Sequence, residues 1–290
     1  MGLLDQGGIN MRSNRRSQCL FGMIVLTVAT TLAVQAQTPT PTPSPTPSLE
    51  HEFFKNILHD QKAIWTAPFH LDRGDMKWVV PGSIGLMALI TTDRITGDEI
   101  GEADGQVTVS RRVSNVGSIY SLAAVSGAFY FVGRAKNNTR ARETGLLSAE
   151  AMINSIIVEG ALKEITQRAR PLDGVERSEF FDGGSSFPSG HSTQAWAVAA
   201  VIANEYKHRP AVQIAAYGIA SAISVARFTG HKHYLSDVVA GSALGYGIGK
   251  YVYHAHHRED GAISKSAWPT IMPQYNRQAR QYGVALTWNF

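Results

Sequence analysis

The sequence predicts an all-α protein, a helical bundle, on three observations. Apolar residues recur at helical spacing in successive segments from Leu49 onward. Glycine, alanine and serine are frequent within these segments, and such small side chains let helices pack closely. The only cysteine, Cys19, lies in the expected leader, so helix packing rather than disulfide bonds is expected to hold the mature fold.

Residues 1–36 are expected to be a secretory signal peptide. Arginines precede the apolar run 20–34, which ends in the small residues that signal peptidase needs. The run is about 15 residues long, short of the roughly 20 that span a bilayer, and a retained anchor is the alternative. Met11 is an alternative start. Residues 37–48 alternate proline with threonine and serine, which predicts an extended linker.

Three regions are expected after the linker: an N-terminal helical region (49–115), a core that carries the motifs (116–260) and a C-terminal tail (261–290). The stretch 93–112, rich in glycine and acidic residues, is expected to be a loop, either on the surface or over a pocket entrance. Side chains alternate over 282–290, as in the last strand of an outer-membrane barrel. One strand cannot close such a barrel, so a terminal strand or a packing tail is expected. The predicted helices span 51–65, 78–92, 118–132, 146–167, 192–206, 211–226 and 236–253.

The first chemical motif pairs Lys163 with Arg170, just before Pro171. Their spacing equals two helical turns, so both cations are expected on one face of a helix that the proline ends. An ordinary solvated helix face is the alternative.

The second motif, 187–191, joins a glycine- and serine-rich stretch to a predicted helix. Ser189 can cap that helix, and Gly190 lets backbone approach a ligand at an end whose free N–H groups favour an anion. His191 could then give a proton to a leaving oxygen. Plain helix capping is the alternative.

The third motif contains Arg227, His233 and Asp237. Because the histidine and the aspartate are i and i+4, we expect them on one helix face, with the carboxylate accepting the Nδ1 proton and leaving Nε2 as a nucleophile. Arg227 adds a fork of donors for phosphate oxygens. A purely structural hydrogen bond is the alternative.

The remaining histidines are given smaller roles. His231 is expected to be a solvent-facing loop residue, with a second proton carrier as the alternative. His254, His256 and His257 form a cluster that could bind zinc, but no cysteine and no suitably spaced carboxylate completes a site, so no metal is expected.

Together, these motifs resemble the type 2 phosphatidic acid phosphatase and vanadium haloperoxidase superfamily, whose pattern is K-x6-R-P, P-S-G-H and S-R-x5-H-x3-D. Only the first position of the third motif departs, with Ala226 in place of the frequent serine. The motifs cover 163–237, and the helical surroundings extend the resemblance to about 118–253. It implies the helical bundle of this superfamily and makes 116–260 a catalytic phosphatase core.

The resemblance also implies a role for each motif residue. His233 would attack phosphorus, Asp237 would orient it, and His191 would protonate the leaving alkoxide and then activate water. Cations and amides would offset the charge of the transition state, so no metal and no cofactor are implied. The residues that would bind the phosphate are Lys163, Arg170, Ser189, Gly190 and Arg227.

The function expected from this resemblance is a metal-independent, acid-type phosphatase that hydrolyses phosphate monoesters or diphosphates through a phosphohistidine. The substrate is expected to be lipid-linked, such as phosphatidic acid or an isoprenyl diphosphate, with a small phosphoester as the alternative. Alternative functions are a vanadium-dependent haloperoxidase and a non-catalytic exported envelope or binding protein.

Charge and hydropathy bear on partners and location. Removing 1–36 lowers the net charge from +4 to +2, which is no nucleic-acid signature. Export to the periplasm or cell envelope is expected. The mean hydropathy of −0.10 favours a soluble or peripheral protein, but small-residue helices also suit a bilayer, so membrane association is left open. The oligomeric state is not predicted.

Overall fold

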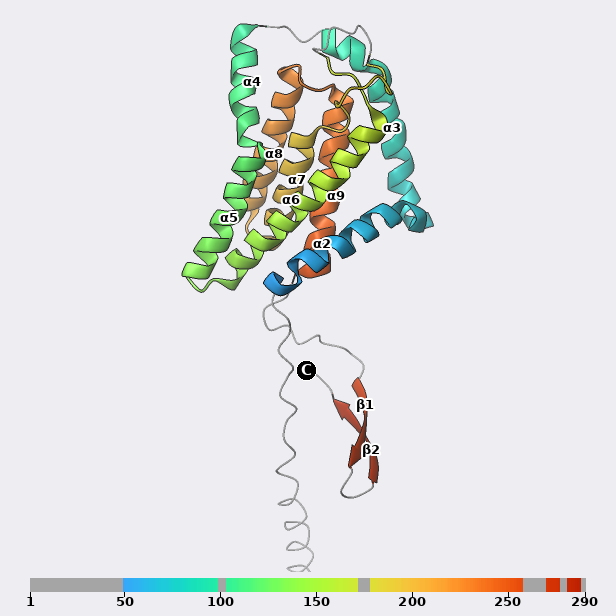
Figure 1. Cartoon of the computed structure of the whole chain (residues 1–290), viewed down its shortest axis with the longest axis vertical. Helices are drawn as coiled ribbons and strands as arrows, with labels where there is room; N and C mark the ends of the chain where they lie inside the picture. Colours follow the sequence, from blue (N-terminus) through green and yellow to red (C-terminus); the bar gives the residue numbers. More distant parts are fainter. Residues whose placement is uncertain (1–48, 99–102, 172–177, 258–269, 277–280, 288–290) are drawn as a thin grey trace, which may run out of the picture. The chain divides into compact units, whose positions relative to one another are not determined.

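The structure is a computed structural model that describes residues 49–98, 103–171, 178–257, 270–276 and 281–287. The described part is mainly helical, which confirms the predicted class (Figure 1). A C-terminal antiparallel hairpin adds two strands, and the second falls where the alternating pattern predicts one. The expected signal peptide and linker lie outside the described residues. The elements are α2 (Leu49–Thr66), η1 (Ala67–His70), α3 (Arg73–Asp98), α4 (Asp104–Val116), α5 (Ile119–Ala135), α6 (Thr139–Thr166), α7 (Gly190–Glu205), α8 (Pro210–Thr229), α9 (Leu235–His256), β1 (Thr270–Asn276) and β2 (Gln281–Thr287).

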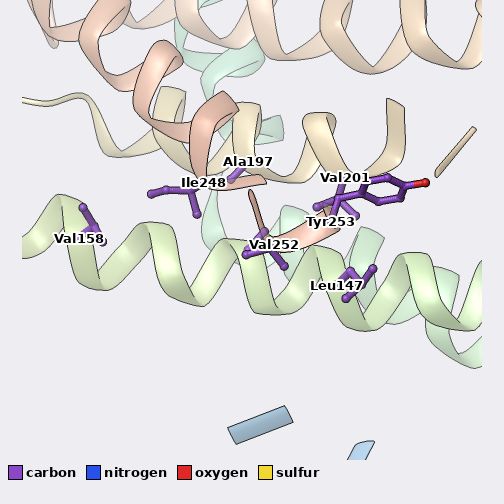
Figure 2. Close-up of a cluster of buried hydrophobic side chains, with 8 residues drawn as sticks. Leu147, Val158, Ala197, Val201, Ile248, Val252 and Tyr253 are labelled. Carbon is purple, nitrogen blue, oxygen red and sulfur yellow. The ribbon is translucent and has the colours of Figure 1, made fainter. Parts of the chain in front are cut away.

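The core lies where α6, α7 and α9 pack together. Its side chains interdigitate between the three helices, and Figure 2 shows the apolar groups of α6 facing those of α7 and α9. Small residues make this packing close: a Cβ added at Gly245 or Gly249 of α9 would collide with the backbone of α7. The buried cluster consists of Leu147, Ala151, Val158, Ala197, Val201, Ile248, Val252 and Tyr253.

The predicted loop 93–112 is wrong over most of its length. Helix α3 continues to Asp98, and α4 begins at Asp104. Tertiary packing outweighs the glycine content, because α4 lies against α8, where Ser110 Oγ and Thr229 Oγ1 are 2.8 Å apart. Asp93, expected at the start of the loop, is fully buried in α3.

Large apolar side chains cover the outer faces of several helices. Three helical segments are long and apolar enough to cross a membrane by length and composition: Asp104–Ala135, which contains α4 and α5, then Thr139–Thr166 and Pro210–Thr229. Many exposed apolar side chains are typical of a surface that contacts lipid or a partner. The most exposed of these side chains include Trp78, Met87, Tyr120, Phe131 and Ile214.

Candidate active site

The structure brings the three sequence motifs together where α6 and α8 end and α7 and α9 begin. These four helices pack as neighbours in the middle of the bundle (Figure 1). The Ser189 N–H donates to the carbonyl oxygen of Asp237 over 3.0 Å, which ties the start of α7 to the start of α9. Two helix N-termini therefore lie beside each other, an arrangement that favours an anion.

His233 is held by a backbone carbonyl. Its Nδ1 lies 2.8 Å from the Ser186 carbonyl oxygen, which can only accept, so Nδ1 carries the proton and Nε2 keeps a lone pair. The expectation that Asp237 takes this proton is wrong, because its Oδ2 is 3.8 Å away. The two residues also share no helix face, since α9 begins at Leu235.

Asp237 instead organises the start of α9. Its Oδ2 accepts hydrogen bonds from Ser186 Oγ at 2.6 Å and from the Tyr234 N–H at 2.9 Å, the second being part of a capping box. Its negative charge still acts on His233 across 3.8 Å and favours positive charge on the imidazole. Asp237 is therefore placed to stabilise a positively charged His233 without a hydrogen bond to it.

A buried arginine network supports Asp237. Arg168 Nη1 donates to Asp237 Oδ1 at 2.6 Å, and Nη2 donates to Asp93 Oδ2 at 2.7 Å. All three side chains are fully shielded from solvent, and the guanidinium lies between the rings of Phe180 and Tyr234. The network fixes the start of α9 against α3 and against the loop that follows α6.

The sequence alone does not reveal this network. Arg168 occupies a variable position inside the K-x6-R-P spacing, and its charge beside Arg170 was the only available signal. Asp93 is 75 residues from Arg168 and 143 from Ser236, whose N–H donates to Asp93 Oδ1 at 3.0 Å, so no local spacing indicates it.

Lys163 lies in a helix, whereas Arg170 lies in the loop that follows it. Helix α6 ends at Thr166, and Gln167 adopts a left-handed conformation, so Arg170 lies in the following loop. The prediction of one shared helix face, ended by Pro171, is wrong. Arg170 Nη2 donates to Ser185 Oγ at 3.2 Å.

A buried carboxylate accompanies Lys163. Glu159 Oε2 pairs with Lys163 Nζ at 2.9 Å, and Gln194 Nε2 donates to Glu159 Oε1 at 3.5 Å. A Cβ added at Gly190 would lie 2.5 Å from Glu159 Oε2. Glycine at 190 thus leaves room for the Glu159 carboxylate, which positions the lysine. The sequence alone does not indicate this role for Glu159.

Arg227 and Ser189 are the remaining motif residues expected to bind phosphate. Arg227 lies in the last turn of α8, and its buried Nε has no hydrogen-bond partner among the described residues. A buried guanidinium N–H without an acceptor is well placed to bind an oxyanion. Ser189 occupies the N-cap position of α7, but its Oγ accepts from Ser192 Oγ at 3.2 Å rather than from the backbone.

The cations of the pocket act on both of its histidines, which lie outside the three candidate spans. Burial, then the charges of Arg227, Lys163 and Arg170, lower the pKa of His191 to about 4. Burial also lowers the pKa of His233, against the opposing effect of Asp237. Both imidazoles are therefore neutral at pH 7 before an anion binds.

His231 lies two residues before His233 and differs from its prediction. Its side chain is buried rather than solvent-facing, and its backbone has a φ of 53°. Its Nε2 has no hydrogen-bond partner within the described ranges.

One family model and one known protein match parts of this chain. A family model described as the PAP2 superfamily matches residues 144–260, which contain all three motifs. The chain is 30% identical over 145 residues to a lipid A 1-phosphatase of Porphyromonas gingivalis. That alignment covers 49% of the chain and 30% of the relative, so the chain spans less than a third of that protein's length.

Two solved structures are similar at low identity. A transmembrane PAP2 type phosphatidylglycerolphosphate phosphatase from Bacillus subtilis has a TM-score of 0.46 at 21% identity, with 73% of this chain and 97% of that chain covered. LpxE of Aquifex aeolicus has a TM-score of 0.40 at 18% identity, with 57% of this chain and 93% of that chain covered.

Proposed function

We propose that the chain is a membrane-associated phosphatase of lipid phosphates that works through a phosphohistidine, on the premise that residues 144–260 match the PAP2 superfamily model. The observation that carries the proposal is the hydrogen bonding of the His233 imidazole. Its Nδ1–H is bound to the Ser186 carbonyl, which leaves Nε2 as a lone-pair nucleophile beside a cationic pocket.

Substrate binding rests on the three cations. Lys163, Arg170 and Arg227 bind the phosphate oxygens, and the N–H groups at the start of α7, beside Ser189 and Gly190, add donors. The positive groups stabilise charge on the equatorial oxygens in the transition state, so this mechanism needs no metal ion in the pocket. A bound dianion also offsets the cations, and this raises the pKa of His191 from its low starting value.

The chemistry then takes two displacements. His233 Nε2 forms a bond to phosphorus as the bond to the leaving oxygen breaks, and protonated His191 gives that oxygen its proton. Neutral His191 next takes a proton from water; the new P–O bond forms, the Nε2–P bond breaks and phosphate leaves. The charge of Asp237 favours the cationic imidazole in both steps.

A lipid substrate is supported by the surface around the helices. Apolar residues such as Trp78 and Met87 are more than half exposed, and three segments have the length and composition of membrane spans. The chain's 30% identity over 145 residues to a lipid A 1-phosphatase points the same way. We place the enzyme in the cell envelope, exported and membrane-associated.

The test is phosphate release by the full chain in detergent and EDTA, from a dispersed lipid phosphate and from a soluble monoester. His233→Ala should lose at least about 10³-fold in turnover, because its nucleophile is gone. His254→Ala, an exposed histidine far along α9, is the matched control and should keep activity.

Trapping gives a second readout. Denaturation during turnover should leave an acid-labile, base-stable phosphoryl group on the wild-type chain and none on His233→Ala. A variant that turns over within about tenfold of wild type would rule out His233 as the nucleophile. Preference for the soluble monoester would reject the lipid assignment alone.

A further inference from the structure

The far end of α9 contains a second histidine–carboxylate cluster, formed by Asp60 of α2, Glu150 of α6 and His256. His256 Nε2 lies 2.8 Å from Asp60 Oδ1 and 3.2 Å from Glu150 Oε1. The three donor atoms all lie within 4.8 Å of one another. The geometry points to a site for a divalent transition-metal ion, Zn²⁺ first, held by these three side chains.

This overturns the reason for expecting no metal near His256. The sequence shows no carboxylate at a suitable spacing, but folding supplies two from distant helices, and Asp60 is 196 residues from His256. His254, counted in the same predicted cluster, is exposed, and its Nδ1 bonds the Lys250 carbonyl of its own helix.

The burial of the two carboxylates and their lack of a lysine or arginine partner both favour a bound cation. Asp60 and Glu150 are 0% and 1% exposed, and no lysine or arginine pairs with either one among the described residues. Two buried carboxylates without positive charge are strongly unfavourable. The nearby His257 cluster differs, because its Glu205 also faces Arg140 at 3.8 Å.

Hydrogen bonding leaves one acceptor unsatisfied. His256 Nε2 can carry only one hydrogen, and the 2.8 Å contact directs it to Asp60. Glu150 Oε1 is fully buried and accepts no hydrogen bond within the described ranges. An ion that replaces this single proton would satisfy the imidazole nitrogen and both carboxylate oxygens at once.

The donor set and its surroundings fit a small borderline ion. Ligand atoms about 2.0–2.1 Å from a tetrahedral Zn²⁺ lie about 3.3 Å apart, close to the observed 2.8 and 3.2 Å. Asn154 Nδ2 donates to Asp60 Oδ2 at 2.9 Å, and Gln61 Nε2 donates to Asn154 Oδ1 at 2.8 Å. Such outer hydrogen bonds orient metal ligands. Mn²⁺ is the other ion that a mixed oxygen and nitrogen set accepts.

The site is remote from the catalytic pocket. Asp237 and His256 lie near opposite ends of α9, roughly 28 Å apart at the rise of an α-helix. The ion would cross-link α2, α6 and α9 and stabilise the fold, and it would take no part in phosphate chemistry.

The test uses the full chain, without a histidine tag, dialysed against EDTA, reloaded with Zn²⁺ or Mn²⁺ alone and desalted. Elemental analysis should find about one ion per chain. With the metal at about 100 times its Kd, the Tm should rise by about 5–10 °C. Co²⁺ should give visible absorption bands from the nitrogen and oxygen ligands.

Two variants and a control localise the ion. His256→Ala and the milder Glu150→Gln should lose the bound ion and the Tm shift, whereas His254→Ala should keep both. A wild-type chain that binds less than about a tenth of an ion of either metal would overturn the proposal and leave the cluster as a proton-sharing group. Undiminished binding by folded His256→Ala would overturn it as well.

Discussion

The two ends of α9 place similar residues in opposite electrostatic surroundings. At its start, His233 lies near Asp237, but Arg168 neutralises that carboxylate. Arg170 and Arg227 also act on His233, and Lys163 acts on the neighbouring His191. At its end, His256 lies between two carboxylates that have no lysine or arginine partner in the described structure. A histidine near an aspartate therefore does not identify a ligand; the net charge of the groups around the pair does. One end suits a phosphate and the other suits a cation.

Among the tests of this comparison, the largest effect is expected from His191→Ala, which tests whether the cationic end also delivers a proton. Loss of a general acid costs about 10²–10⁴-fold, so hydrolysis of an alkyl phosphate should fall by that factor. A nitrophenyl phosphate, whose leaving group needs little protonation, should fall much less. Equal losses for both substrates would contradict the acid role.

The pH dependence of kcat/KM tests the acid role of His191, and its direction can be predicted. The acid must be protonated, and the pKa of free His191 is lowered to about 4, so kcat/KM should decline as pH rises above that value. The corresponding decline in kcat should occur at higher pH, because a bound phosphate offsets the cations and raises the pKa of His191. Both declines should disappear in His191→Ala.

Removal of Arg168 tests whether its charge is what distinguishes the two ends. Arg168→Met leaves Asp93 and Asp237 buried without a counter-charge, and we expect a loss of about 3–5 kcal/mol in the free energy of unfolding. A chemical denaturation series in detergent measures it. Arg168→Met combined with Asp93→Asn should recover part of the loss, since one buried charge is then removed. No recovery would mean that the arginine acts through packing alone.

The sequence predicts the groups that face the substrate better than the groups that support them. The motifs bring in His191, His233 and Asp237, because each lies in a short segment at the start of a helix or just before it. The supporting Asp93 comes from α3, and the Asp60–His256 pair joins positions 196 residues apart. Such contacts are set by how the helices pack, which helical periodicity alone does not specify.

Local conformation explains the remaining differences. His233 and Asp237 have helical spacing, but the helix starts between them, so their partners change to the Ser186 carbonyl and the Tyr234 N–H. In the same way, Arg170 leaves the helix of Lys163 because Gln167 turns the chain with a φ of 43°. Residue spacing predicts a shared face only where the helix continues through both residues.

The smallest effect separates the two ends through the glycines of α9. A Cβ at Gly241 would lie 2.7 Å from the Ser189 carbonyl at the start of α7, and one at Gly249 would collide with Ala197 farther along. One at Gly247 meets nothing within 4 Å. Gly241→Ala and Gly249→Ala should each cost about 1–3 kcal/mol from overpacking, whereas Gly247→Ala should be neutral or slightly stabilising. Only Gly241→Ala should also lower kcat/KM in protein that remains folded, because it displaces Ser189. Equal losses of kcat/KM in Gly241→Ala and Gly249→Ala would mean that the two ends of α9 are coupled rather than independent.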